Sequence, residues 1–268
     1  MPTLPDWSPL IVIAAVAVAT AVGLRLSPRD AVVRETVFPT LVDTVVVGLL
    51  AARLGYVVQW WPSYAADPWS IVRIGDGGFL WWMGVPASLA FLVWRMRRVP
   101  AARRALAGAV LAGALTWAAG TLLSIHFDSA PPRLPQLALQ TLEGEAVSWG
   151  AEQGRPRVLN LWATWCPPCR RELPAFVDAQ RARPDIEFVL LNQGESAAEV
   201  ADYLTRAALP GQGVLLDGAA SASQALAVRA YPATYFYDAE GRLLDRHYGE
   251  LTAGGLAGKL QSLFGDAP

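Results

Sequence analysis

Four long apolar stretches in the first half of the chain constrain its fold more than any other feature. A helix needs about 17–25 mostly apolar residues to cross a bilayer. No polar helical face recurs within the stretches, which favours membrane spans over amphipathic helices buried in a globule. The first and third are short for a span, and for them the buried helix is the alternative. The stretches are Leu10–Leu26, Phe38–Val58, Phe79–Trp94 and Ala105–Ile125.

The composition agrees with a membrane region followed by a soluble domain. The chain of 268 residues is 53% hydrophobic and 17% charged, and its apolar excess lies in the first half. This is too apolar for one soluble globule. We therefore predict a membrane α-helical region of about four spans over residues 1–128. The net charge of −1 gives no reason to expect a nucleic acid partner.

The positions of the arginines predict how the spans are oriented. One group follows the first stretch and a second separates the third from the fourth: Arg25, Arg29 and Arg34, then Arg95, Arg97, Arg98, Arg103 and Arg104. Because positive residues stay in the cytoplasm, the N-terminus lies outside and four spans return the chain to the outside. Arg73, in an outer loop, is a mild exception. A cleavable signal peptide is the alternative for the first stretch, but no basic residue precedes it.

A proline-rich segment marks the boundary between the two halves. Residues 129–136 contain Pro131, Pro132 and Pro135 and predict a short, stiff linker. Beyond it, over 137–268, strand and helix patterns alternate, which predicts an α/β domain with a mixed sheet. The predicted strands are 137–142, 146–149, 157–163, 186–191, 214–216, 233–237 and 243–248, and the predicted helices are 167–182, 196–208, 219–227 and 252–264.

The two cysteines of the chain carry its most specific chemistry. Cys166 and Cys169 frame a Cys-Pro-Pro-Cys motif at the start of a predicted helix, where the peptide dipoles stabilise a thiolate. The second sulfur, one turn along, can attack a mixed disulfide formed by the first.

Two other interpretations of the pair are a static disulfide and half of a zinc site. Structural zinc takes four ligands, and the only other candidates, His126 and His247, are far apart in the sequence. A disulfide that closes so short a loop adds little stability. The pair therefore predicts a redox-active disulfide that needs no metal or organic cofactor.

The residues around the cysteines resemble those of a known family. The run VLNLWATWCPPCRRELP over 158–174, and later Tyr-Pro-Ala-Thr-Tyr over 231–235, are similar to the thioredoxin-fold domain of TlpA-like thiol:disulfide oxidoreductases, which are membrane-tethered and face the periplasm. The likeness covers about 137–263. It implies that Cys166 is the nucleophile, Cys169 the resolving thiol and Pro232 a cis-proline opposite them. Asn192, Gln193 and the helix that follows resemble the segment that such proteins insert into the fold.

The same resemblance implies roles for several supporting residues. Glu172 matches an acidic residue that tunes the cysteines in some relatives, and Asn160 stands where thioredoxins carry a buried Asp. Trp165 and Tyr231 are candidates for the active-site surface, and the Pro167-Pro168 dipeptide for setting the redox potential. For Trp165 and Tyr231 the alternative is simple packing, and for Glu172 it is an ordinary solvated residue.

The family also suggests direction and partners. It implies periplasmic protein substrates with disulfides and reduction rather than oxidation or isomerisation, including roles in cytochrome c maturation or metal-site assembly. Because the membrane half has no cysteine, it cannot pass electrons by thiol exchange, and a separate membrane electron donor is expected. The predicted location is the bacterial cytoplasmic (inner) membrane, multi-pass, with the C-terminal domain in the periplasm or cell exterior.

The membrane half has a resemblance of its own. Residues of about 41–98, including Ala-Arg-Leu-Gly-Tyr at 52–56 and Asp-Gly-Gly-Phe-Leu-Trp-Trp-Met-Gly at 76–84, look like the first part of prolipoprotein diacylglyceryl transferase. That family has His-Gly-Gly in its signature loop, where this chain has Trp82 and Met83 at the first two positions, and its later arginine segment has no counterpart. We infer a membrane scaffold without transferase activity. The alternatives are a lipid-modifying or lipid-binding protein with an accessory thioredoxin domain, and a binding module.

Overall fold

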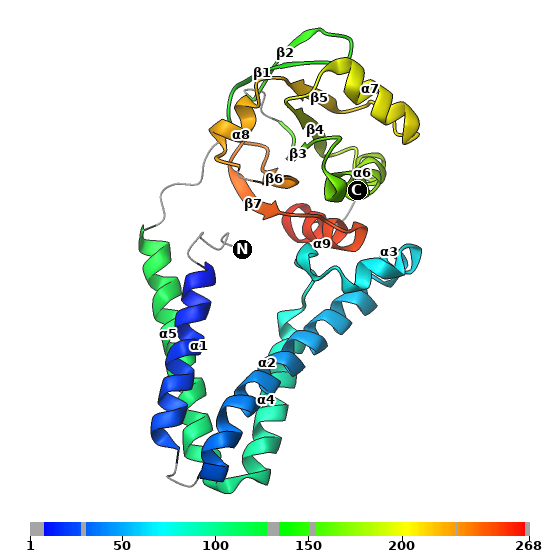
Figure 1. Cartoon of the computed structure of the whole chain (residues 1–268). Helices are drawn as coiled ribbons and strands as arrows, with labels where there is room; N and C mark the ends of the chain where they lie inside the picture. The colour runs from blue at the N-terminus through cyan, green and yellow to red at the C-terminus, as the bar shows by residue number, and fades with distance from the viewer. Residues whose placement is uncertain (1–7, 28–30, 128–133, 151–153, 229, 266–268) are drawn as a thin grey trace. The chain divides into compact units, whose positions relative to one another are not determined.

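The computed structural model describes residues 8–27, 31–127, 134–150, 154–228 and 230–265 (Figure 1). The chain divides into two compact units, each of which takes more than one segment of the sequence. A helical unit comprises Leu4–Gln59 and Phe79–Ser129, and an α/β unit includes Trp60–Gly78 and Ala130–Pro268. Most of the predicted linker 129–136 lies outside the described residues.

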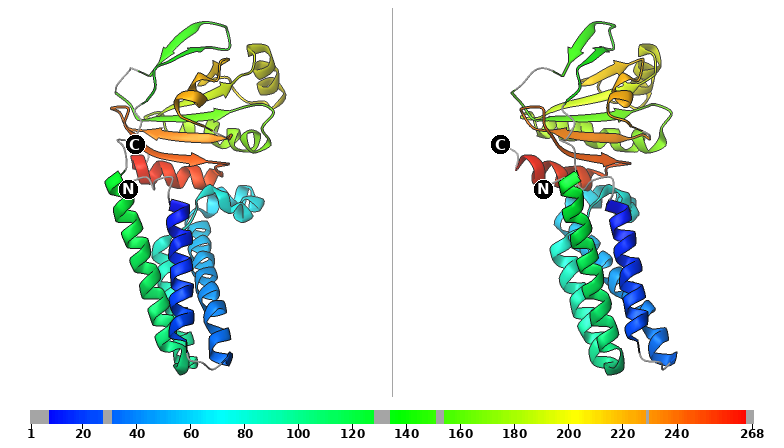
Figure 2. Two further views of the ribbon diagram at one scale, coloured as in Figure 1. Left: turned by 60° about the vertical axis from the view of Figure 1, so that its left-hand side comes forward. Right: turned by 90° about the vertical axis from the view of Figure 1, so that its left-hand side faces the viewer.

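Two pairs of helices build the helical unit (Figures 1 and 2). Helix α1 packs along α5, and α2 packs along α4. The bounds are α1 Ser8–Leu26, α2 Ala31–Gln59, α4 Trp81–Arg98 and α5 Arg103–Phe127, with the short 3₁₀ turn η3 at Pro100–Ala102. A Cβ atom on Gly84 would lie 2.8 Å from the carbonyl oxygen of Gly48. The absence of that Cβ lets α2 and α4 approach closely, as small residues do between membrane helices.

Two of these helices have the length and composition of a membrane span. Within the described part of the chain, the segments Glu35–Gln59 and Pro100–Ser124 are sufficiently long and apolar. The apolar part of α1, Leu10–Leu26, is shorter, and α4 carries three arginines in its last turn. The arrangement of about four spans therefore remains a prediction for α1 and α4.

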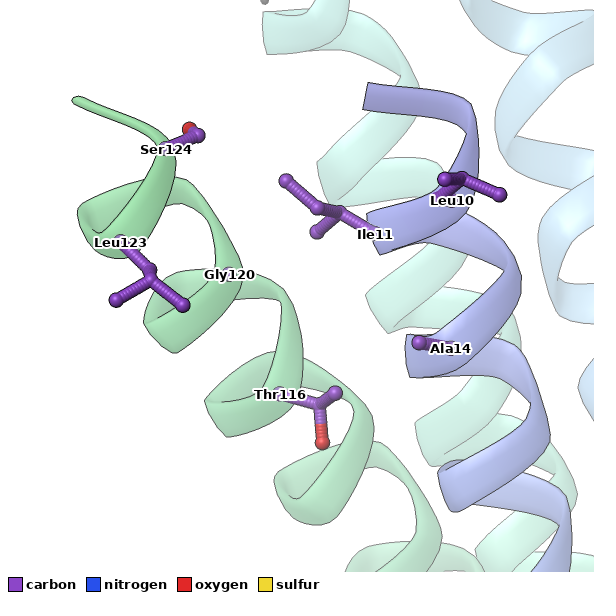
Figure 3. A pocket seen from close by; sticks show the side chains of 7 residues that line it. All are labelled: Leu10, Ile11, Ala14, Thr116, Gly120, Leu123 and Ser124. Atoms are coloured by element: carbon purple, nitrogen blue, oxygen red, sulfur yellow. The ribbon is translucent and has the colours of Figure 1, made fainter. Parts of the chain in front are cut away.

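A pocket of about 580 Å³ lies between α1 and α5 (Figure 3). Its polar lining consists of two hydroxyls, and both are already bonded to their own helix: Thr116 donates to the carbonyl of Ala112, and Ser124 to that of Thr121. The pocket therefore offers a mainly apolar surface. It is lined by Leu10, Ile11, Ala14, Thr116, Gly120, Leu123 and Ser124.

A mixed sheet forms the centre of the α/β unit, as the sequence predicts, and its seven strands lie in the order β2-β1-β5-β4-β3-β6-β7. Strand β4 pairs in parallel with β3 and β5, and the remaining neighbours are antiparallel. The strands are β1 Leu137–Gln140, β2 Ala146–Trp149, β3 Arg157–Trp162, β4 Glu187–Gln193, β5 Val214–Asp217, β6 Ala233–Tyr237 and β7 Leu243–Tyr248.

Helices cover both faces of this sheet. Alternate residues of β3 point to opposite sides, so Val158 and Trp162 face one cluster of buried side chains and Leu159 and Leu161 face another. The first cluster includes side chains of α6, α7 and α9, and the second includes side chains of α8. The helices are α6 Pro167–Ala182, α7 Ala197–Arg206, α8 Ser221–Ala225 and α9 Ala253–Phe264.

The ends of the helices follow local capping chemistry. Helix α6 has the predicted bounds, and α7 begins after Ser196, whose hydroxyl forms a capping box with Glu199. The predicted helix 219–227 is shorter in the structure. Ala220 takes a left-handed conformation, and the Asp217 carboxylate accepts from the amide of Ser221 at 2.9 Å, so α8 begins only there.

The segment Trp60–Gly78 belongs to the α/β unit. It contains helix α3, Trp61–Ala66, and two 3₁₀ turns, η1 Pro68–Val72 and η2 Ile74–Asp76. By sequence position it falls within the membrane region 1–128, between two apolar stretches. Its side chains nevertheless contact the turn before α9, at residues far away in the sequence.

Candidate active site

Cys166 and Cys169 form a disulfide at the start of α6. The first four amides of a helix have no partner within it, and Pro167 and Pro168 remove two of them. The amide of Cys169 is therefore the first donor of the helix, and it lies 3.3 Å from Sγ of Cys166. After reduction, this amide and the helix dipole would stabilise a thiolate at Cys166.

The two sulfur positions differ in access to solvent. Cys166 is 3% exposed and Cys169 is fully buried. Of the two cysteines, Cys166 alone therefore has accessible surface. The roles of nucleophile for Cys166 and resolving thiol for Cys169 stay predictions.

Trp165 and Tyr231 form an aromatic surface beside the disulfide. Trp165 is 66% exposed, and its ring meets the ring of Tyr231 edge to face, with centroids 5.9 Å apart. Tyr231 packs in turn against the buried cluster that contains both cysteines. Trp165 is therefore not a core residue, and its role in contacting a partner stays a prediction.

A chain of hydrogen bonds through Ser223 to Gln193 holds the Tyr231 side chain in place. The Tyr231 hydroxyl is 2.7 Å from Oγ of Ser223, and Ser223 donates to Oε1 of Gln193 at 2.6 Å. Because the Ser223 proton is used there, Tyr231 is the donor to Ser223. The sequence gives no signal for Ser223, which lies in a small-residue stretch. The peptide bond between Tyr231 and Pro232 is cis, and the carbonyl of Pro232 accepts from the amide of Gly249.

Glu172 is a buried carboxyl, not a solvated one. It is 1% exposed, and it follows Cys169 by three residues on the same face of α6. Its Oε1 accepts from Nδ2 of Asn160 at 2.7 Å, and its Oε2 accepts from the amide of Leu251 at 2.8 Å. Burial raises the pKa of Glu172 to about 8, although both hydrogen bonds act to lower the pKa. A group with this pKa can take up or release a proton near neutral pH.

The loop before the cysteines is fixed by a carboxylate that the sequence alone does not reveal. Glu195 accepts from the amide of Thr164 at 2.7 Å, from the hydroxyl of Thr164, and from Nδ2 of Asn192 at 2.6 Å. These bonds tie the loop to the end of β4.

A groove of about 480 Å³ lies between residues of α6 and residues at the end of α7, and Pro167 is part of its lining. Arg171 pairs with Glu250, and the Arg170 guanidinium lies over the ring of Tyr203 at 5.6 Å. The groove is lined by Pro167, Arg170, Arg171, Pro174, Tyr203, Ala207 and Leu209.

His247 makes none of the contacts described above. Burial, followed by the charge of Lys259, lowers the pKa of His247 to about 4, so this side chain is neutral at pH 7. The side chain of His126 lies outside the described residues. Within the described residues, no group of three or more metal-ligating side chains occurs.

Two family models match the two halves of the chain. The Redoxin model matches residues 129–260, and the prolipoprotein diacylglyceryl transferase model matches residues 5–120. The thioredoxin-like protein YneN of Bacillus subtilis is 32% identical over 128 residues, which are 44% of this chain and 71% of that protein. The thiol:disulfide interchange protein DsbE of Tatumella citrea is 30% identical over 155 residues, which are 54% of this chain and 82% of that protein.

A similar solved structure is that of StoA from Bacillus subtilis. It shares 26% sequence identity with this chain and superposes with a TM-score of 0.40, covering 47% of this chain and 96% of StoA.

Proposed function

Because this chain belongs to the Redoxin family, as a thiol-disulfide oxidoreductase joined to a membrane region similar to prolipoprotein diacylglyceryl transferase, we propose that it exchanges disulfides with proteins through Cys166 and Cys169. The observation that carries the proposal is the disulfide at the N-terminus of α6, with a buried carboxyl of raised pKa one turn further on. These are the parts that activation and resolution of a thiol require.

In the reducing direction, the Cys166 thiolate attacks one sulfur of a substrate disulfide. A mixed disulfide forms, the substrate bond breaks, and the departing sulfur takes up a proton. Cys169 then loses its proton to Glu172, and its thiolate attacks Sγ of Cys166. The bond between Cys166 and the substrate breaks, and the departing substrate sulfur takes up the proton that Glu172 received. The substrate leaves with two thiols, and its two electrons have come from the cysteine pair, which ends as the disulfide seen in the structure.

The supporting residues act on the partner protein. The exposed Trp165 and the half-buried Tyr231 provide an aromatic surface for a substrate peptide, and the cis-proline Pro232 follows Tyr231 in the chain. Pro167 and Pro168 leave the Cys169 amide free to point at Cys166.

We further propose that the chain is anchored in the bacterial cytoplasmic membrane and presents its C-terminal domain to the periplasm or cell exterior. The two arginine groups and the two long apolar helices support this topology. Because no cysteine lies in the membrane half, the cysteine pair receives its electrons from a separate membrane donor.

Reduction is the direction we favour over oxidation or isomerisation. Equilibration of the full chain with glutathione measures the potential of the cysteine pair directly. A value near about −120 mV, as in the strong oxidants of this fold, would make the protein an oxidase.

A trapping experiment tests the exchange itself. In cells, Cys169→Ser leaves Cys166 without its resolving thiol, so mixed disulfides with substrates accumulate and can be identified by mass. Cys166→Ser is the matched control and gives no adduct. The absence of adducts from Cys169→Ser, or equal adducts from both variants, contradicts exchange through this pair.

Transfer of lipid is the distant alternative. Labelled phosphatidylglycerol and a lipobox peptide would reveal it, and turnover that survives Cys166→Ser would favour it. Trp82 and Met83, in the place of the family's signature residues, argue against this activity.

A further inference from the structure

A buried carboxylate outside the redox site holds the segment Trp60–Gly78 within the α/β unit. Asp76 is 2% exposed, and its Oδ2 accepts from the hydroxyl of Tyr64 at 2.8 Å and from Oγ1 of Thr252 at 2.6 Å. Its Oδ1 accepts from the amide of Gly78 at 3.0 Å. A carboxylate is buried at low cost only when donors surround it, and here one donor comes from the turn before α9.

The start of α9 is shaped to receive this segment. Thr252 is the N-cap of α9: its Oγ1 accepts from the amide of Gly255 at 3.0 Å while it donates to Asp76. The negative charge of Asp76 is therefore favoured by the helix dipole. A Cβ atom on Gly254 would lie 2.5 Å from the ring of Tyr64, so the contact requires glycine there.

A second contact of the segment is made with Glu250, the residue before Leu251. Arg73 Nη1 is 3.2 Å from Oε1 of Glu250, and the other oxygen of Glu250 is bonded to Arg171 of α6. Glu250 and Thr252 are thus both held by the segment. Between them stands Leu251, whose amide donates to Glu172.

We propose that Trp60–Gly78 is a docking segment for the thioredoxin-like domain, and that Arg73 and Asp76 are positioning residues that hold the Leu251 amide against Glu172. The contacts of Asp76 and Arg73 support the docking itself. Its effect on thiol exchange rests on the proposed function. In the sequence the segment joins α2 to α4, so the connection between two helices of the membrane region acts on the redox site.

The groups around Glu172 determine the expected pH effect. Glu250 is the charged neighbour that acts on it, and both Arg171 and Arg73 pair with Glu250. Asn160 from β3 is neutral, and Cys169 of α6, bonded in the disulfide, becomes a titratable thiol when the pair is reduced. The Leu251 hydrogen bond lowers the pKa of Glu172, so loosening the turn raises it further.

The full-length chain in lipid nanodiscs tests the proposal with Asp76→Ala and Tyr64→Phe. The second variant removes only a hydroxyl and so keeps the test valid if the first fails to fold. Asp202→Ala, an exposed carboxylate on α7, is the control. Two quantities are measured: amide hydrogen exchange in peptides over 61–78 and 249–256, and the pH dependence of single-turnover thiol exchange.

We expect Asp76→Ala to accelerate exchange in both peptides by about tenfold or more, with a smaller effect for Tyr64→Phe and none for Asp202→Ala. The midpoint of the pH profile should move up by about half a unit or more. Unchanged hydrogen exchange in Asp76→Ala overturns the docking. Faster hydrogen exchange with an unchanged midpoint of the pH profile for thiol exchange overturns the positioning role. If the wild-type chain shows no thiol exchange, the proposed function fails, while hydrogen exchange still decides the docking.

Discussion

Glu172 accepts a hydrogen bond of 2.7 Å from Asn160 in the interior of the α/β unit. Asn160 donates a second bond of 3.1 Å to the hydroxyl of Thr234 on β6, so α6 and two adjacent strands are joined at one amide. An amide in this position leaves Glu172 as the titratable group of the pair. The group that can take up or release a proton at the redox site therefore lies on α6 and not on β3.

The pH dependence of resolution should follow Glu172. Its pKa is raised to about 8, so the carboxylate that accepts the Cys169 proton becomes more populated as pH rises through 8. Single-turnover formation of the Cys166–Cys169 disulfide from a preformed mixed disulfide should accelerate over that range. Glu172→Gln should slow the step by about 10²-fold, the scale of general base catalysis, and remove this limb of the profile. A Gln variant that keeps the wild-type profile would exclude Glu172 as the base.

Stability should also depend on Glu172. The folded-state pKa lies above the ordinary value of 4.5, so the native state keeps a proton that the unfolded state loses. Its contribution to the free energy of unfolding is complete below pH 4.5 and is lost as pH rises to about 8, with a slope of at most about 1.4 kcal/mol per pH unit.

Urea denaturation of wild type and Glu172→Gln at several pH values checks this dependence. The difference in the free energy of unfolding between the two proteins should change from pH 4.5 to about 8 and level off above that range. Glu143→Gln, at an exposed position of the β1–β2 turn, is the control and should parallel the wild type. A constant difference between wild type and Glu172→Gln would contradict the raised pKa.

Trp165 and its neighbour Trp162 should respond in opposite ways to truncation. Trp165 is 66% exposed, so Trp165→Ala should change stability by less than about 0.5 kcal/mol while raising KM for a protein disulfide and leaving a small disulfide unaffected. Trp162 is fully buried, and Trp162→Ala should destabilise the domain by about 3–5 kcal/mol. Equal losses on both substrates for Trp165→Ala would show that it does not contact the partner protein.

The Tyr231–Ser223 hydrogen bond should affect activity as a unit. Tyr231→Phe removes the bond between Tyr231 and Ser223, and Ser223→Ala removes that bond together with the one to Gln193. Each should lower kcat/KM on a protein disulfide by about threefold to tenfold, the value of one hydrogen bond. In a double-mutant cycle the combined variant should lose little more than either single variant. Full additivity would mean that Ser223 does not act through Tyr231.

Local patterns determined much of the fold in advance. The start of α6 at Pro167, the capping box at Ser196 and the hairpin strands β6 and β7 all depend on residues within a few positions of one another. A helix cap or strand period involves short separations, so the sequence carries it directly. The candidate cysteines are visible for the same reason.

Only the tertiary structure decided the burial of Glu172 and the place of the segment Trp60–Gly78. Glu172 is enclosed by Asn160 and Leu251, and Asp76 by Thr252, partners that lie 12 to 176 residues away in the chain. The pKa of a carboxyl depends on the desolvation and donors around it, which no local pattern specifies. Sequence position assigned Asp76 to a connection between membrane helices, whereas packing joined it to the domain that carries the redox chemistry.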